Sequence, residues 1–242
     1  MHPILFHLGR QPVPTFAVLA VFGLMVALAL SERTAKPAGL LPERLLDAAQ
    51  FAAIAAFVIT RILLIAANWK AFLAAPMFLL VFPSLTPLGM LLTTVATILW
   101  LRSKDLSVLS VFDAWAPCAT LLWCFLALGH FAEGSDPGLP TALPWGLPMN
   151  GHKVALHPVA VYAAIIAAGL TLYLLRRLQR HSSAAPQGLI LTGLGQFFLS
   201  FAREPGFPAP LDLDSLQWVA LSMIVVGGLL IPNTIRRTGA DS

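Results

Sequence analysis

The side chains in this sequence that could do chemistry stand at the ends of long apolar runs. His130 and Glu133 lie three residues apart where the run 108–131 finishes, so a continuing helix would carry both on one face. A histidine titrates near neutrality and a carboxylate can fix its tautomer, so this pair could serve as a general base with an orienting partner. The alternative is a polar helix end that meets lipid headgroups.

Arg61 stands deep inside another apolar run, 47–68, in the sequence Ile-Thr-Arg-Ile-Leu-Leu. A charge at the centre of a spanning helix costs roughly 2.5–3.5 kcal/mol on insertion scales, so it needs a partner inside the bundle. A lipid phosphate suits the planar guanidinium, which binds it through two hydrogen bonds. The alternative partner is a buried acid such as Asp113, for which we favour a structural role near a helix end.

Three more polar residues complete the set. Arg203 closes an apolar run and is followed by Glu204, while His157 opens the fifth long run with Tyr162 about one turn later. Arg203 could bind an anionic headgroup, or it could pair with Glu204 or Glu133. A tyrosine at a membrane interface is common, so His157 and Tyr162 alone are weak evidence for a site.

The composition predicts that these residues sit in a membrane protein. Hydrophobic residues make up 58% of the 242 residues, charged residues only 11%, and the mean hydropathy is +0.81. A soluble domain usually carries about 25% charged residues to cover its surface. Although the pI is near 9.5, the basic residues form short clusters with no extended face, which argues against nucleic acid. We expect one transmembrane helical domain over 1–242.

Hydropathy predicts about seven spanning helices, because each span needs roughly 20 mostly apolar residues. The piece 71–83 is too short to span and contains Pro76, so we expect an interfacial or re-entrant segment there. Cys118 and Cys124 lie six residues apart on one predicted helix and point to different faces, so they cannot form a disulfide. We expect them to be packing residues. The predicted spans are 13–31, 47–68, 85–101, 108–131, 155–175, 187–203 and 216–232.

The basic clusters predict the orientation of these spans. With seven spans, every cluster falls on one side of the membrane, and the positive-inside rule makes that side cytoplasmic. The N-terminus is then outside and the C-terminus is in the cytoplasm. This topology gathers the polar residues in the outer half of the bundle and predicts a lipid-headgroup site there. The clusters are Arg33, Lys36 and Arg44; Arg102 and Lys104; Arg176, Arg177 and Arg180; and Arg236 and Arg237.

No metal-ligand spacing, phosphate loop or nucleotide motif is present in the sequence, so we expect no metal and no cofactor. Several short motifs resemble, in order and spacing, those of the bacterial prolipoprotein diacylglyceryl transferases. The motifs are Pro3-Ile4-Leu5-Phe6 with Gly9, Arg61-Ile62, Asp113 with Ala116-Pro117, His157-Pro158 with Tyr162, and Phe201-Ala202-Arg203-Glu204-Pro205.

The resemblance implies a seven-span enzyme of the bacterial inner membrane. Such enzymes transfer the diacylglyceryl group of phosphatidylglycerol to the lipobox cysteine of a preprolipoprotein, so an anionic phospholipid and that protein are the implied partners. His130, Glu133 and Arg203 would then be catalytic residues. Arg61, His157, Tyr162 and Gly129 would bind the lipid headgroup.

The sequence departs from the family at its signature, which aligns with 126–135 and keeps only Gly129 and Phe131. The family's arginine is Ala127 here, and its first asparagine is His130. In one hypothesis a divergent transferase uses His130 as a replacement base. In the other hypothesis the fold is retained but the acceptor or the activity has changed. A hypothesis from another functional class is a membrane scaffold that binds lipid or a partner protein without catalysis.

Overall fold

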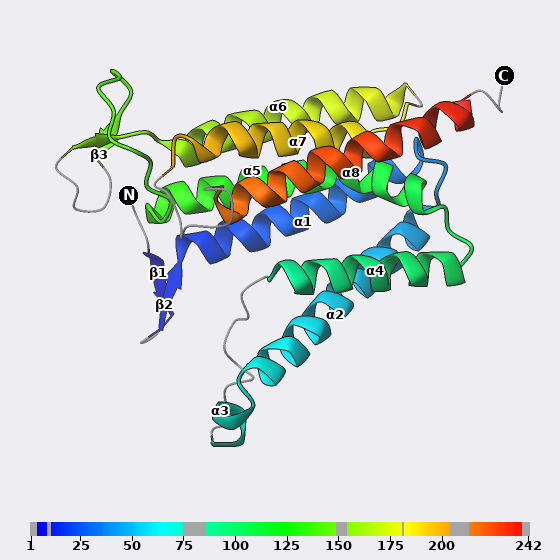
Figure 1. The fold of residues 1–242 in the computed structure, drawn as a ribbon, viewed down its shortest axis with the longest axis horizontal. Helices are drawn as coiled ribbons and strands as arrows, with labels where there is room; N and C mark the ends of the chain where they lie inside the picture. Colours follow the sequence, from blue (N-terminus) through cyan, green and yellow to red (C-terminus); the bar gives the residue numbers. More distant parts are fainter. Residues whose placement is uncertain are drawn as a thin grey trace.

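The computed structural model describes residues 4–8, 11–74, 86–148, 154–180, 182–203 and 213–238. Within these ranges the chain forms helices that run along a common direction, with two small hairpins at one end (Figure 1). The helices are α1 (Thr15–Ala35), α2 (Pro42–Ala67), α3 (Trp69–Ala74), α4 (Pro87–Ser103), α5 (Val108–Glu133), α6 (Val159–Gln179), α7 (Ala185–Ser200) and α8 (Ser215–Thr238). The strands are β1 (Ile4–Leu8) with β2 (Gln11–Pro14), and β3 (Leu147–Pro148) with β4 (Ala155–Leu156).

Each predicted span coincides with one of the long helices. Four of them, α1, α2, α5 and α6, are long and apolar enough to cross a membrane, and α4 and the described part of α8 are shorter apolar helices. Large apolar side chains face outward along them, with Met25 63% and Leu229 70% exposed. A water-facing surface of this kind would be unstable, whereas lipid is its natural solvent. The predicted helical membrane architecture is therefore confirmed.

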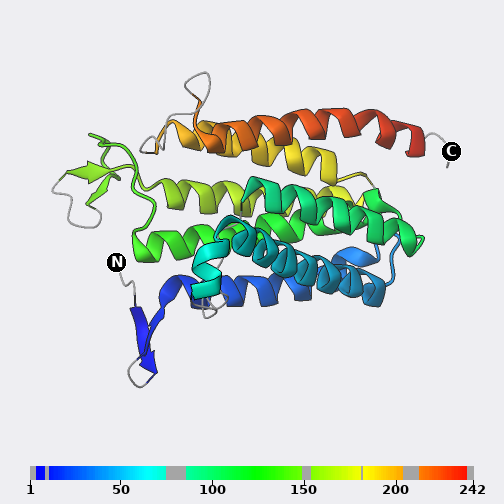
Figure 2. The ribbon, with the colours of Figure 1, turned by 60° about the horizontal axis from the view of Figure 1, so that its bottom comes forward.

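Helix α5 is the centre of the bundle. It packs against α1, α6 and α7, and α8 lies along the outer side of α7. Helix α2 packs on α4 and on α1, and its second half leans away from the other helices (Figure 1). Turned by 60°, the bundle shows α1, α5 and α6 as successive layers, with α2 and α4 to the front (Figure 2). The ends of α5, α6 and α7 are thus held by direct packing.

Close approach between helices depends on small residues and buried hydroxyls. The Thr171 hydroxyl of α6 donates to the Thr120 hydroxyl of α5 at 2.9 Å, which links two helices that both face apolar surroundings. Gly227 of α8 lies so close to α7 that an added Cβ would sit 2.7 Å from the Pro186 carbonyl oxygen. A larger side chain there would push α8 off α7.

We therefore expect Gly227→Ala to destabilise the bundle by about 1–3 kcal/mol, the usual cost of overpacking. Gly228→Ala is the matched control, because an added Cβ at Gly228 meets nothing within 4 Å. Thermal unfolding of the purified protein in one detergent measures both. Equal melting temperatures for the two variants would contradict this account of the α7–α8 contact.

Asp113 has the structural role that we favoured. This buried side chain lies one to two turns into α5, and its Oδ1 accepts three hydrogen bonds from the start of α7: from the Ser183 hydroxyl at 2.8 Å, the Ala184 amide at 2.8 Å and the Ala185 amide at 2.7 Å. The first amides of a helix have no acceptor within the helix, and a carboxylate also complements the helix dipole. Asp113 thus joins α7 to α5.

Asp113→Ala should cost about 3 kcal/mol, because buried donors left without an acceptor each cost about 1–3 kcal/mol. Asp113→Asn keeps an acceptor oxygen and should cost less than half as much. Asp47→Ala removes an exposed acid from α2 and should change stability little. Melting temperatures of the purified variants in detergent test this order of stability at position 113: Ala below Asn, and Asn below wild type. An Asp113→Ala variant as stable as the Asp47→Ala variant would refute it.

Two other predictions concern the cysteines and the segment 71–83. Cys118 and Cys124 are both free, as expected, and Cys118 is buried against Thr34. Of the segment 71–83, only the part up to residue 74 is described and it belongs to α3; residues 75–85 lie outside the described ranges. The hairpins β1–β2 and β3–β4 were not predicted. They are too short to show an alternating apolar pattern.

Candidate functional site

Four helix ends meet at one end of the bundle. There α5 and α7 finish, while α1 and α6 begin, and the loop 134–148 lies beside them (Figure 1). We call this the site end. Six of the predicted site residues lie there, at the end of α5, in the first turn of α6 with the residues before it, or just after α7. These are Gly129, His130, Glu133, His157, Tyr162 and Arg203.

A glycine turns the chain back over His130. Gly134 caps α5 in the left-handed conformation, with φ of 67°, a geometry that glycine adopts at little cost. The Ser135 amide then donates to the His130 carbonyl at 3.1 Å. This reversal brings the Ser135 hydroxyl to 2.8 Å from Nδ1 of His130. The imidazole is held through Nδ1, which leaves Nε2 for chemistry.

The other face of His130 is covered from α1. The Phe16 ring lies 4.7 Å from the His130 ring, centroid to centroid. An added Cβ on Gly129 would sit 2.8 Å from Cδ2 of Phe16, so only glycine lets Phe16 approach α5 this closely. Ser135 and Phe16 therefore fix the histidine from two sides. Glu133, the predicted orienter, is the last residue of α5, but the ring's short hydrogen bond is to Ser135.

Arg203 forms an ion pair with the loop. Its Nη2 lies 2.8 Å from Oδ2 of Asp136, and both side chains are largely covered, with exposures of 20% and 21%. Asp136 is a partner that the sequence analysis did not name, and Glu204 lies outside the described residues. The Nε of Arg203 is buried and has no hydrogen-bond partner among the described residues. A buried N–H donor of this kind is costly unless something binds it.

Backbone hydrogen bonds hold the loop between α6 and α7. The Leu139 amide donates to the Ala202 carbonyl at 2.9 Å, and the His157 amide donates to the Leu139 carbonyl at 3.0 Å. Gly138 is pressed between these two segments: an added Cβ would contact the His157 carbonyl and sit 2.9 Å from the Ala202 carbonyl. Gly138 and Leu139 of the loop thus set the distance between His157 and the end of α7.

A chain of polar groups continues from His157. The Trp145 indole donates to the Tyr162 hydroxyl at 2.7 Å, and that hydroxyl lies 3.4 Å from Nδ1 of His157. An indole N–H can only donate, so the tyrosine oxygen accepts there and its own proton is free to point at His157. In that arrangement Nε2 of His157 carries the proton and can donate to an anion.

Gly138→Ala tests this loop clamp. Because the added methyl must displace either His157 or the end of α7, we expect activity to fall about 10-fold to 100-fold, the usual range for groups misplaced by an ångström. Gly169→Ala on α6 is the control, since its Cβ would meet nothing within 4 Å. Unchanged turnover in the Gly138 variant would show that the clamp does not position the site.

The structure does not place Arg61 with this group. Its neighbours Thr60 and Leu63 face the start of α4, where a Cβ added to Gly89 would sit 3.4 Å and 3.5 Å from their side chains. Its guanidinium lies over the Phe57 ring at 5.0 Å, a favourable cation–π contact. The second half of α2 diverges from α5, α6 and α7 (Figure 1). Hydropathy predicts where Arg61 lies along its span, but it contains no information on the direction in which α2 leans.

Sequence reasoning missed Ser135, Asp136, Gly138 and Trp145 as parts of the site. They all belong to the loop that follows α5, and a long loop between spans is a general signal for function. Nothing in the sequence distinguishes these four residues from the rest of the loop, because three of them act through contacts with residues far along the chain. Among the described residues, no group of three or more His, Cys, Asp or Glu side chains could hold a metal ion.

The relatives found by comparison with known proteins carry the same name. The phosphatidylglycerol–prolipoprotein diacylglyceryl transferase of Cupriavidus metallidurans is 36% identical over 133 residues, which cover 49% of this chain and 48% of that protein. The enzyme of the same name from Idiomarina loihiensis is 33% identical, covering 59% of this chain and 57% of its own length.

A third relative of that name, from Clostridium tetani, is 23% identical over 237 residues, covering 94% of this chain and 95% of that protein. The alignments with the first two relatives span only about half of their lengths. The family model described as prolipoprotein diacylglyceryl transferase matches residues 3–232. The resemblance seen in the short motifs is therefore confirmed, and this chain belongs to the prolipoprotein diacylglyceryl transferase family.

Proposed function

We propose that this chain transfers the diacylglyceryl group of phosphatidylglycerol to a cysteine thiol of a preprolipoprotein. The observation that carries the proposal is Arg203. Its guanidinium is largely covered, its buried Nε has no hydrogen-bond partner among the described residues, and Leu139 links the backbone of the preceding Ala202 to that of His157. A phosphate diester is an anion that guanidinium donors bind well. Family membership supplies the reaction class.

The proposed setting is the inner membrane of a bacterium. All seven long helices would cross it, with the N-terminus outside and the C-terminus in the cytoplasm. Two features support this orientation: the basic clusters lie at the end of the bundle opposite the site end, and the site end then meets the outer leaflet. A lipid donor and an exported protein acceptor would both reach the site from that side.

The reaction replaces a carbon–oxygen bond by a carbon–sulfur bond. The thiol loses its proton to a base, and the thiolate attacks the glyceryl carbon that carries the phosphate ester. That C–O bond breaks with its electron pair going to oxygen, so glycerol phosphate leaves and a thioether remains. The step therefore needs a proton acceptor near the thiol and cations or N–H donors near the leaving phosphate.

His130 is the proposed base. Its Nδ1 is engaged with Ser135 and one ring face is covered by Phe16, so Nε2 is the atom that would take the thiol proton. The role requires the tautomer in which Nδ1 donates to the Ser135 hydroxyl oxygen and Nε2 is unprotonated. Gly129 allows Phe16 its position, and Glu133 lies at the same helix end to stabilise the imidazolium that forms.

Arg203 and His157 are the proposed phosphate ligands. The Asp136 carboxylate uses Nη2 of Arg203, which leaves Nε and the other Nη for a phosphate oxygen. His157 would donate from Nε2, with Tyr162 and Trp145 fixing its tautomer. Arg61 would bind a lipid phosphate on the α2 side of the bundle, where a headgroup waits before it enters the site.

The test is turnover by the purified full chain in phosphatidylglycerol nanodiscs. With glycerol-labelled lipid and a lipobox peptide, we expect labelled glycerol phosphate to appear together with a thioether-linked peptide. Release of glycerol phosphate without peptide modification would assign a different acceptor. If lipid is bound but none is consumed, the chain is a lipid-binding scaffold and the proposal is wrong.

A further inference from the structure

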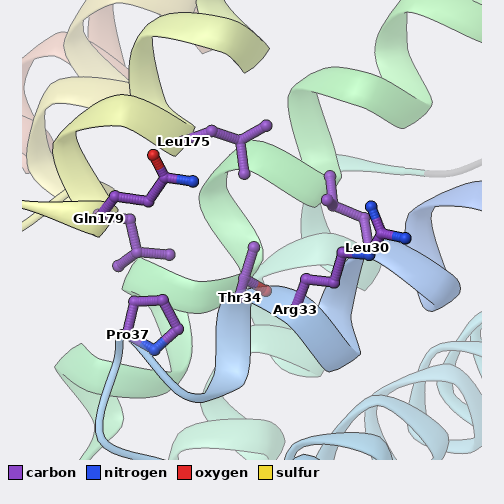
Figure 3. Close-up of a pocket in the computed structure, with 7 residues that line it drawn as sticks. Leu30, Arg33, Thr34, Pro37, Leu175 and Gln179 are labelled. Carbon is purple, nitrogen blue, oxygen red and sulfur yellow. The ribbon is translucent and has the colours of Figure 1, made fainter.

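A pocket lies at the opposite end of the bundle from the site end, where α1 and α6 finish. It has a volume of about 160 Å³ and is lined by Leu30, Arg33, Thr34 and Pro37 on the α1 side and by Leu175 and Gln179 on the α6 side (Figure 3). None of these residues takes part in the proposed reaction. A helix of 21 residues is about 30 Å long, so the pocket is separate from the site.

The pocket exists because α1 and α6 rest on the same neighbour. Both helices pack against α5. Thr34 reaches α5 through Cys118, with its Oγ1 3.7 Å from the sulfur, while Leu178 of α6 packs beside Ala116. These α5 side chains are small, so the gap between α1 and α6 stays open. Its walls at Leu30 and Leu175 are apolar, and an aliphatic chain would fill them.

The rim of the pocket is polar and cationic. Arg33 stands at its edge beside Leu30, and the Gln179 amide points toward α1 from the other side (Figure 3). No carboxylate is among the lining residues. The local charge favours an anion.

From this combination we propose that the pocket binds an anionic phospholipid that is not a reactant. Its acyl chain would lie along Leu30 and Leu175, its phosphate would accept from the Arg33 guanidinium, and Gln179 would donate to an ester carbonyl or phosphate oxygen. Basic pockets between spanning helices bind anionic headgroups in this way. Inorganic phosphate would gain nothing from the leucine walls, which is why a lipid is the occupant.

Lipid binding to the purified, delipidated full chain tests the proposal. Native mass spectrometry would count lipids bound during titration with phosphatidylglycerol, or with phosphatidylcholine as the neutral probe. Every variant is made in an Arg203→Gln background, so that changes at the site end do not contribute. We expect Arg33→Gln to weaken phosphatidylglycerol binding about 5-fold, the effect of one basic residue on an anionic lipid. Arg102→Gln, an exposed arginine at the end of α4, should have no effect.

Leu175→Trp provides an independent variant that fills the pocket and keeps its charge. It should remove one bound lipid, whether or not the Arg33 variant folds well. Equal binding of phosphatidylcholine would overturn the headgroup assignment, and competition by millimolar inorganic phosphate would show that the pocket binds a free anion. No turnover by the wild-type chain, with lipid binding in this pocket intact, would contradict the proposed function and leave this inference standing.

Discussion

Arg203→Gln should lower kcat for diacylglyceryl transfer by about 300-fold, with a much smaller change in KM. Charge develops on the phosphate oxygen as the C–O bond breaks, so an arginine that donates there acts most strongly in the transition state. Removing one such preorganised donor commonly costs about 100-fold to 1,000-fold in kcat. Arg203→Lys keeps a charge but loses the planar fork, and should recover only part of the rate.

Asp136 separates catalysis from structure in this test. If Arg203 only anchors the loop, Asp136→Asn removes the same ion pair and should cost as much as Arg203→Gln. If Arg203 binds the leaving phosphate, Asp136→Asn should change kcat less than about 5-fold, because the guanidinium that acts in the transition state is kept and only one ion-pair contact is lost. Arg102→Gln, at the far end of α4, also removes one arginine charge and is the control. Its kcat should equal that of the wild type.

The helices were predictable because the bilayer imposes their length. A span must be apolar and must satisfy its backbone within itself, so hydropathy alone locates α1, α2 and α4 to α8 within a few residues. Asp113 was also predictable in kind, since a buried carboxylate needs donors. Its actual donors, at Ser183 to Ala185, lie about 70 residues away and have no local pattern.

The loop contacts of the site were not predictable for a related reason. Leu139 joins Ala202 and His157 through backbone groups, and every residue type offers the same backbone groups. Asp136 is one more acid in a loop, and nothing in the sequence selects it over Glu133 or Glu204 as the partner of Arg203. Arg61 differs for another reason: its place along the span is predicted from the sequence, but the lean of α2 accompanies its packing with α4 (Figure 1).

His130→Gln should reduce kcat by about 100-fold or more, the contribution usual for a general base. Glutamine can still reach the Ser135 hydroxyl and pack on Phe16, so folding should be preserved while the proton acceptor is lost. The remaining activity should rise with pH as the acceptor thiol ionises by itself, because the variant then depends on thiolate already present. Wild type, with its own base, should show a shallower rise above neutrality.

Two further variants decide whether His130 acts as the base. Ser135→Ala removes the hydroxyl 2.8 Å from Nδ1 and should cost about 5-fold with the wild-type pH profile kept, as expected for a positioning group held by one neutral hydrogen bond. His7→Gln replaces an exposed histidine of β1 and should leave kcat unchanged. A peptide whose cysteine ionises at lower pH should restore most of the His130→Gln rate. Failure of that rescue, with lipid still bound, would move the role of base to His157, whose Nδ1 neighbour Tyr162 is then the next residue to replace.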